Sequence, residues 1–254
     1  MSQMSGQELV SVVIPTHNNA AFVSQAIESV LAQSYRNHEI IVVDDGSTDD
    51  TRQALKPYLD KITYIFQENQ GPGAARNLGI RRSRGAYIAF LDADDVWLEG
   101  KLDRQMQFFQ GHQDVGLVFG ELEHWVERGE RIPTERIGGS GSVVGSNGDV
   151  IVKDAFKLLL GACYILTSTV VIRRDCLNAI GEFDESLRAG QDRHLWLRVA
   201  RKYPIGKVEQ ILVRKRSHER NLTLKSKLCI ECRIRTFEPI LDDPGPLNDH
   251  DLVA

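Results

Sequence analysis

The chain has 254 residues, of which 42% are hydrophobic, and a formal net charge of -4. This length and composition allow one large α/β domain, or two small ones, with a sizeable core. The negative charge argues against a protein that holds nucleic acid by bulk electrostatic attraction, so we expect no nucleic-acid partner.

The chain lacks clear export or membrane signals. Residues 1–8 have neither the basic start nor the apolar run of a secretory signal. The best candidate for a membrane span, residues 158–172, is short and interrupted by glycine, serine and threonine. The four cysteines are few and scattered, as is usual in a reducing compartment. We therefore expect a cytoplasmic protein.

The first hundred residues alternate between two kinds of pattern. Short runs rich in valine and isoleucine predict strands, and stretches with apolar residues at helical spacing predict helices. This alternation is typical of a mainly parallel sheet covered by helices on both faces, so we predict a Rossmann-like α/β fold in a single domain. The expected strands are residues 9–15, 39–44, 62–66 and 86–92, and the expected helices are residues 21–33, 48–59 and 73–83.

Beyond residue 100 the alternation is weaker. Residues 127–149 are rich in glycine, serine and arginine and are expected to form an exposed loop. Residues 241–254 have the composition of a disordered tail. Between them we expect helices at residues 101–110 and 190–203, and strands at residues 115–120, 164–174 and 208–218.

Acidic and polar turns follow three of the predicted parallel strands, at residues 15–19, 44–50 and 92–95. Ligands of open α/β sheets bind beyond the carboxyl ends of the strands, so these turns should share one rim. Two carboxylates about 4 Å apart repel by roughly 4 kcal/mol at an effective dielectric of 20, so crowded aspartates favour a bound cation. Mg²⁺ or Mn²⁺ suits such an oxygen-only site. Alternatively, Asp94 or Asp95 caps a helix that starts near Val96.

Six segments carry a resemblance to a known family. In chain order they read VSVVIPTHN, IIVVDDGSTDDT, QGPGAARNLGI, GAYIAFLDADDVW, GEFDESL and GQDRHLWLRVA. Together they cover about residues 9–220 and resemble family 2 glycosyltransferases, which have the A-type nucleotide-diphospho-sugar transferase fold. The resemblance implies a glycosyltransferase domain at 9–220, divided into a nucleotide-sugar-binding half (9–100) and an acceptor-side half (101–220). Residues 221–254 would form a partly disordered C-terminal extension.

The resemblance also implies roles for residues on the rim. Asp45 would contact the nucleotide base, with Asp44 beside it, and a buried acceptor of this kind suits an N–H of a pyrimidine. Arg76 would contact the diphosphate or sugar, although it could equally be a cation on a helix surface. The other nucleotide-sugar-binding residues would be Pro15, Thr16, Asn18, Asp92 and Ala93, and the metal-binding residues Asp92, Asp94 and Asp95.

Asp192 is the candidate catalytic base. On a helix it shares a face with Leu195, Trp196 and Val199, so its carboxylate points toward the body of the protein. Partial burial there would raise its pKa. Spacing alone favours a first-turn acid that interacts with the helix dipole, but the resemblance places the family's base here. The family often has Glu-Asp at this point, where this chain has Gln191 followed by Asp192.

Two further residues resemble family positions near the diphosphate. Arg216 and His218 would reach it from the last predicted strand, unless they belong to a solvated basic patch. The basic character of this region also leaves open a peripheral approach to anionic lipid at the inner face of a membrane.

Taken together, these features predict an inverting glycosyltransferase of the hexosyltransferase type. It would move a sugar from a nucleoside-diphosphate sugar, with a UDP-sugar favoured, to a hydroxyl of a glycan or lipid-linked acceptor. It would use Mn²⁺ or Mg²⁺ and an aspartate base, in polysaccharide or cell-envelope biosynthesis. The alternatives are a haloacid-dehalogenase-like phosphatase with Asp92 as nucleophile, and a non-catalytic sugar-nucleotide-binding protein. A nucleotidyltransferase is disfavoured, because no Gly-rich basic loop follows the first strand.

Overall fold

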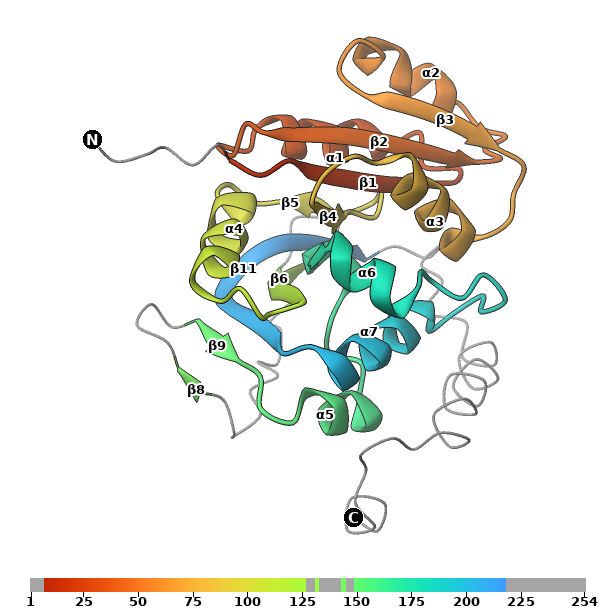
Figure 1. Ribbon diagram of the computed structural model, residues 1–254. Helices are drawn as coiled ribbons and strands as arrows, with labels where there is room; N and C mark the ends of the chain where they lie inside the picture. Colours follow the sequence, from red (N-terminus) through yellow and green to blue (C-terminus); the bar gives the residue numbers. More distant parts are fainter. Residues whose placement is uncertain (1–6, 127–130, 133–142, 145–148, 218–254) are drawn as a thin grey trace.

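The computed structural model describes residues 7–126, 131–132, 143–144 and 149–217 (Figure 1). A single mixed sheet runs through the described chain in the strand order β3-β2-β1-β4-β10-β6-β11-β9-β8. Helices pack on both of its faces, so the predicted α/β fold is confirmed.

The first half of the chain builds the parallel part of the sheet. Neighbouring strands in the order β3-β2-β1-β4 all run in the same direction, as the valine- and isoleucine-rich runs predict. The strands are β1 (Val10–Thr16), β2 (His38–Asp45), β3 (Thr63–Gln67) and β4 (Tyr87–Phe90), and the segments between them are α1 (Val23–Leu31), α2 (Thr51–Leu55), η1 (Lys56–Tyr58) and α3 (Pro72–Arg82).

The second half makes the sheet mixed. Strand β10 (Val171–Arg173) pairs antiparallel with both β4 and β6 (Leu117–Val126), and β6 pairs parallel with the long β11 (Ile205–Ser217). Short strands β5 (Val96–Trp97) and β9 (Val150–Ile151) pair with different parts of β11. The remaining elements are α4 (Lys101–Gly111), β7 (Arg131–Ile132), β8 (Val143–Val144), α5 (Ala155–Gly161), η2 (Thr167–Thr169), α6 (Arg174–Ile180) and α7 (Gln191–Lys202).

Two hydrophobic clusters fill the spaces between the sheet and its helices. Successive residues of a strand point to opposite faces. Accordingly, Val12 of β1 belongs to the cluster under α1 and α4, whereas Val13 belongs to the cluster under α6 and α7. Both side chains are fully buried. The unbroken apolar sequence of β1 therefore reflects a strand that is covered on both faces.

One local expectation and one alternative were wrong. Residues 164–174 do not form one strand, because η2 precedes the short β10 and Thr169 Oγ1 donates to the Leu166 carbonyl at 2.7 Å. Hydroxyl side chains that bond nearby backbone favour such turns over strands. No helix starts near Val96, since β5 occupies that position and α4 begins at Lys101 after the left-handed Gly100 (φ 77°). Most of the loop predicted at 127–149, and the tail at 241–254, lie outside the described residues.

The apolar stretch at residues 158–172 is divided among α5, η2 and β10. In the part of the chain that the structure describes, no helix has the length and hydropathy needed to cross a membrane.

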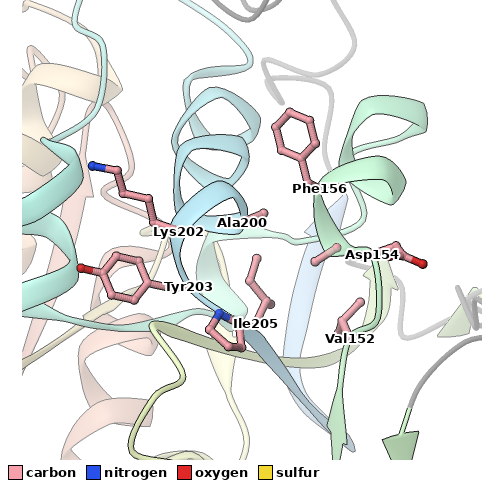
Figure 2. Close-up of a pocket in the computed structure, with 9 residues that line it drawn as sticks. Val152, Asp154, Phe156, Ala200, Lys202, Tyr203 and Ile205 are labelled. Atoms are coloured by element: carbon pink, nitrogen blue, oxygen red, sulfur yellow. The ribbon is translucent and has the colours of Figure 1, made fainter. Parts of the chain in front are cut away.

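A hollow of about 350 Å³ lies where α7 ends and β11 begins (Figure 2). Phe156 and Asp154 line one side of it, and Lys202 and Tyr203 line the other. Because Ile205, the first residue of β11, lies in its wall, the hollow is at the opposite end of that strand from the acidic turn beside Arg216. It is therefore separate from the predicted rim.

The close packing of α3 on β1 depends on Gly79. A Cβ atom on this residue would lie 2.3 Å from Val13 Cγ1, inside the buried interface. We expect Gly79→Ala to lower the free energy of unfolding by roughly 1–3 kcal/mol, because the overpacked interface must shift. Urea denaturation would measure the change. Gly111→Ala, at the end of α4 with nothing within 4 Å of the added carbon, is the control. Equal stability of the two variants would contradict this account.

Candidate active site

The polar turns after β1 and β2 lie side by side at one edge of the sheet. Thr16, the last residue of β1, is in register with Asp44 of β2. The His17 ring nitrogen Nδ1 lies 2.8 Å from the Asp45 carbonyl, and the Asn18 amide donates to Ser47 Oγ at 3.0 Å. The turn after β4 starts beside them, because the Leu91 amide donates to the carbonyl of Val13 in β1. The three turns thus share a rim.

Asp45 organises the segment that leads into α3. Its Oδ1 accepts hydrogen bonds from Gln67 Nε2 at 2.7 Å and from the Gln70 amide at 2.8 Å, and its Oδ2 accepts one from the Gly71 amide at 2.8 Å. The carboxylate is buried. Both oxygens therefore bond to protein, and the predicted contact with a nucleotide base would use their remaining lone pairs.

Asp44 is also held by the protein. Its Oδ1 accepts from the Ser47 amide at 2.9 Å, and its Oδ2 accepts from the Tyr64 hydroxyl at 3.0 Å. Burial, together with this hydrogen bond, raises the pKa of Tyr64 to about 12. Asp44 thus anchors the turn after β2, beside Asp45.

The residues predicted to wall the nucleotide pocket lie at the end of β1. Pro15 is buried in the strand, and Thr16 is only 2% exposed. Thr16 Oγ1 has no hydrogen-bond partner among the described residues, so it is a buried hydroxyl available to a ligand. Asn18 has a left-handed backbone (φ 54°), and its Oδ1 accepts from the amides of Thr48 and Asp49.

The acidic turn at residues 92–95 contains two kinds of aspartate. Asp92 and Asp94 are partly exposed, and the buried Ala93 lies between them. Asp95 is buried: its Oδ2 accepts from Ser168 Oγ at 2.6 Å, and its Oδ1 accepts from the Arg216 amide at 3.1 Å. Burial and the charges of Asp94 and Asp92 raise the pKa of Asp95 well above its ordinary value. Asp95 thus stabilises the turn, whereas Asp92 and Asp94 are partly exposed.

Arg76 reaches across from α3 to this turn. Its Nη2 lies 2.6 Å from Asp92 Oδ1, and its guanidinium lies over the Phe183 ring, 5.5 Å from the centroid. The residue is only 6% exposed, and its Nε and Nη1 atoms have no partner among the described residues. The alternative of a cation on a helix surface is therefore wrong. Arg76 is a buried cation with two unused donors beside the acidic turn.

Asp192 occupies the first turn of α7, after the left-handed Gly190. Its Oδ1 accepts from the Arg193 amide at 2.7 Å. Burial raises the pKa of Asp192; the charge of Arg76 acts to lower it and that of Asp92 to raise it. Asp192 is therefore within electrostatic range of Arg76 and Asp92, although it lies about a hundred residues further along the chain.

Arg216 supports the acidic turn from β11. Its guanidinium lies 4.6 Å from the Phe22 ring centroid and 4.3 Å from that of Trp125. Its Nη2 donates to Gln25 Oε1 at 2.7 Å, and its Nε donates to the Asp94 carbonyl at 3.2 Å. Buried and bonded in this way, Arg216 fixes the turn in place, while its predicted diphosphate contact stays a prediction. His218 lies outside the described residues.

Comparison with known proteins identifies the family. The model for glycosyl transferase family 2 matches residues 11–174. The chain belongs to this family. An uncharacterised glycosyltransferase of Rickettsia typhi is 31% identical over 233 residues, which are 88% of this chain and 68% of the relative. The enzyme class is therefore glycosyltransferase.

Solved structures share the fold of this family 2 enzyme. S. aureus TarS, solved in complex with UDP, matches with a TM-score of 0.72 and 21% identity over 95% of this chain and 68% of that chain. The mannosyltransferase PcManGT of Pyrobaculum calidifontis, solved with GDP-Man and Mn²⁺, matches with a TM-score of 0.69 and 18% identity. That match covers 96% of this chain and 67% of the other. The resemblance to the A-type fold is thereby confirmed.

Two residues of the site were missed at the level of sequence. Ser168 Oγ accepts from the Asp92 amide at 3.1 Å while donating to Asp95, and so connects η2 to the acidic turn. Its only signal in the sequence is a Thr-Ser-Thr triplet inside an apolar run that is typical of a strand. Phe183, which lies under Arg76, sits in the GEFDESL segment, to which no role had been given.

The donor set suits a divalent metal ion that binds together with a ligand. Among the described residues, no group of three or more histidine, cysteine or acidic side chains is arranged to hold a metal ion. Mg²⁺ and Mn²⁺ sites commonly use only one or two carboxylates together with substrate phosphates. Asp92 and Asp94, partly exposed and carrying only oxygen donors, fit such an arrangement.

The bridging role of Ser168 predicts the effect of removing its hydroxyl. Ser168→Ala should lower the free energy of unfolding by roughly 1–3 kcal/mol, because buried Asp95 and the Asp92 amide each lose a partner. Thermal unfolding would measure this loss. Ser186→Ala removes a hydroxyl from an exposed turn and should change stability by less than about 0.5 kcal/mol. A Ser168→Ala protein as stable as the Ser186→Ala control would rule out the bridging role.

Proposed function

We propose that this enzyme is an inverting glycosyltransferase that moves a sugar from a nucleoside-diphosphate sugar to a hydroxyl of a glycan or lipid-linked acceptor. The setting we propose is polysaccharide or cell-envelope biosynthesis. The observation that carries the proposal is the buried Arg76, which has two unused donors, is ion-paired with Asp92 and acts electrostatically on Asp192. A candidate donor-binding group and a candidate base thus lie within electrostatic range of each other.

The proposed donor side comprises the turns after β1 and β2. TarS was solved with UDP and PcManGT with GDP-Man, which supports a nucleoside-diphosphate sugar as the donor of a chain with the same fold. Asp45, a buried acceptor, would receive an N–H of the base, and the free hydroxyl of Thr16 is a second group available to the nucleotide. A pyrimidine N–H suits this acceptor, so we favour a UDP-sugar. We propose residues 9–100 as the donor half and residues 101–220 as the acceptor half of one domain.

Arg76 would bind the donor through the nitrogens that the protein leaves unpaired. A buried N–H without a partner costs about 1–3 kcal/mol. The Nε and Nη1 atoms of Arg76 recover hydrogen bonds if phosphate or sugar oxygens of the donor occupy the space beside Asp92. Arginine is well suited to phosphate oxygens because its donors lie in a rigid plane.

Asp92 and Asp94 are the residues that would hold Mn²⁺ or Mg²⁺, together with the donor diphosphate. When bound, such an ion neutralises the charge that develops on the leaving diphosphate, so no protein acid is required there. The role of Asp95 in this proposal is to keep the turn in shape, because its two oxygens are already bonded to Ser168 and Arg216.

Asp192 would act as the base. Its carboxylate takes the proton of the acceptor hydroxyl as the hydroxyl oxygen forms a bond to the anomeric carbon of the sugar. The bond from that carbon to the diphosphate oxygen breaks on the opposite face, and the nucleoside diphosphate departs with the bonding electrons. The raised pKa of Asp192 supports this role, because a carboxylate that is a stronger base removes the proton more effectively.

The alternative of a phosphatase that uses Asp92 as its nucleophile is less well supported. Asp92 follows the fourth strand along the chain, not the first, and is ion-paired with Arg76 at 2.6 Å. A non-catalytic binder would differ from the proposed enzyme only in turnover.

The roles of the two aspartates can be separated by assaying a panel of UDP- and GDP-sugars with Mn²⁺, Mg²⁺ or EDTA. Asp94→Ala should abolish metal-dependent donor binding. Asp192→Asn should keep donor binding but lower the rate of donor hydrolysis by about 10²- to 10⁴-fold, since only the base is lost. Calorimetry and release of nucleoside diphosphate are the measurements. Asp175→Asn, an exposed residue paired with Arg173, is the control.

Three outcomes would count against the proposal. Absence of binding to any sugar nucleotide would remove its basis. Cleavage of a phosphate monoester that depends on Asp92 would favour the phosphatase. Tight donor binding without turnover would favour a binder.

The pH dependence of kcat/KM should report the raised pKa of Asp192. The base must be ionised to accept a proton, so kcat/KM should fall as the pH drops through the pKa of Asp192, which lies above the ordinary aspartate value. Arg76→Gln should move this acid limb to higher pH, because Arg76 acts to lower the pKa of Asp192. Steady-state rates across the acid range test both points. An acid limb at the ordinary aspartate pKa that does not move in Arg76→Gln would argue against Asp192 as the base.

A further inference from the structure

Arg76 is bonded to the acidic turn through a single nitrogen. Its Nη2 lies 2.6 Å from Asp92 Oδ1, whereas Nε and Nη1 have no partner among the described residues. A single bond of this kind lacks the geometric specificity of a bidentate pair, so the guanidinium plane can rotate about it. A second contact is needed if the two unused donors are to keep one orientation.

The ring of Phe183 supplies this second contact. Arg76 Cζ lies over the ring, 5.5 Å from its centroid. This distance is within the range in which a guanidinium is attracted to the face of an aromatic ring. Phe183 is only 4% exposed, so its ring also shields the guanidinium face that it covers from water. The ring therefore restricts the plane in which the unused donors of Arg76 lie.

The Phe183 ring is itself held by two other aromatic rings. Its centroid lies 5.3 Å from that of Phe90, with the planes at 81°, and 6.0 Å from that of Trp196, with the planes at 73°. Edge-to-face contacts of this kind are a preferred geometry for aromatic pairs. Phe90 is the last residue of β4, just before the acidic turn, and Trp196 belongs to α7. The ring under Arg76 is thus fixed against the strand that carries the acidic turn and against the helix that carries Asp192.

The backbone of Phe183 is held by Asn77, the residue that follows Arg76 in α3. Asn77 Oδ1 accepts from the Phe183 amide at 2.9 Å, and Asn77 Nδ2 donates to the Phe183 carbonyl at 2.8 Å. The same Nδ2 also donates to Glu185 Oε1 at 2.9 Å, so both of its hydrogens are used. Asn77 is only 2% exposed. Two successive residues of α3 therefore supply the guanidinium and hold the ring beneath it.

We propose that Phe183, held by Asn77, is a positioning residue that orients the Arg76 guanidinium for the donor. Phe183 and Asn77 do not contact the donor in this proposal, because both act through Arg76. The inference rests on the proposed function, since it takes Arg76 as the group that binds phosphate or sugar oxygens. A side chain that is already held in its binding orientation loses less conformational freedom when the ligand arrives, which strengthens binding.

The first test measures the position of Arg76 without any ligand. The protein reacts with phenylglyoxal, which modifies arginine, and peptide mass mapping compares Arg76 with the exposed Arg84 of the same protein. Phe183→Leu should raise the rate at Arg76 relative to Arg84 about threefold or more, because the guanidinium loses the ring that holds and covers it. Equal rate ratios in Phe183→Leu and the unsubstituted protein would overturn the proposal.

The control for this test is Phe119→Leu. Phe119 belongs to the same hydrophobic cluster as Phe183 and is equally buried, with 4% exposure. Its substitution removes a ring of the same size from the core and should leave the modification of Arg76 unchanged. An increase as large as that in Phe183→Leu would indicate general loosening of the core and overturn the proposal.

The role of Asn77 is tested by the same reaction. Asn77→Ala should also speed modification of Arg76, because the Phe183 backbone loses both of its bonds to the side chain. Since the effect passes through the ring, Asn77→Ala/Phe183→Leu should react no faster than Phe183→Leu alone. Additive effects would overturn the assigned role of Asn77. If Phe183→Leu does not fold, Asn77→Ala carries both tests, because it keeps the aromatic rings.

The second test measures binding of UDP and of GDP, each with Mn²⁺, by calorimetry. Phe183→Leu should weaken binding of the nucleotide that the protein prefers by roughly three- to tenfold, whereas Phe119→Leu should leave it unchanged. In an Arg76→Gln background, Phe183→Leu should have no further effect, because the group that it positions is gone. Weakening by the same factor in both backgrounds would indicate a purely structural role and overturn the proposal.

The two tests separate this inference from the proposed function. An unsubstituted protein that binds neither nucleotide would contradict the proposed function. The modification rates at Arg76 would still decide whether Phe183 and Asn77 hold its guanidinium, since that reaction requires no nucleotide.

Discussion

The site depends on the way the structure accommodates several carboxylates at one strand end. Asp92, Asp94 and Asp95 lie within four residues, and Asp192 lies within their electrostatic influence. Two buried guanidinium groups offset the repulsion among these carboxylates. The Arg76 guanidinium pairs with Asp92, and the Arg216 guanidinium donates to the Asp94 carbonyl, while the Arg216 backbone amide donates to the Asp95 carboxylate. Without them, the repulsion between neighbouring carboxylates would oppose folding of the turn.

The two arginines differ in the hydrogen bonds that their guanidinium groups make with the protein. Arg216 lies between two aromatic rings and bonds to Gln25, so its contribution is to fix geometry. Arg76 uses one nitrogen for Asp92 and keeps two buried donors without a partner among the described residues. Buried donors without partners are rare in native proteins. This contrast is why we assign ligand binding to Arg76 and support to Arg216.

Helix α7 links the proposed base to the acceptor side. Asp192, Arg193 and Trp196 lie on its first turns, and they respectively approach the acidic cluster, bind the end of α5 and hold the Ile165 carbonyl. The proposed base thus lies on a helix whose first turns are bonded to α5 and to the segment that follows it. Such preorganisation keeps an attacking group and its base in a productive geometry.

Sequence alone determined the order of the parallel strands and helices, the shared rim and the aspartates on it, because local periodicity and the direction of parallel strands are readable from residue types. Which aspartates are buried and bonded, and which are partly exposed, was decided only by the tertiary structure. Asp95 is directed inward by Ser168 and Arg216, which are 73 and 121 residues away from it along the chain. The burial of Arg76 and the bonds from Arg193 to the end of α5 likewise arise from packing between distant elements. Burial and hydrogen-bond partners are properties of that packing, which no local sequence pattern encodes.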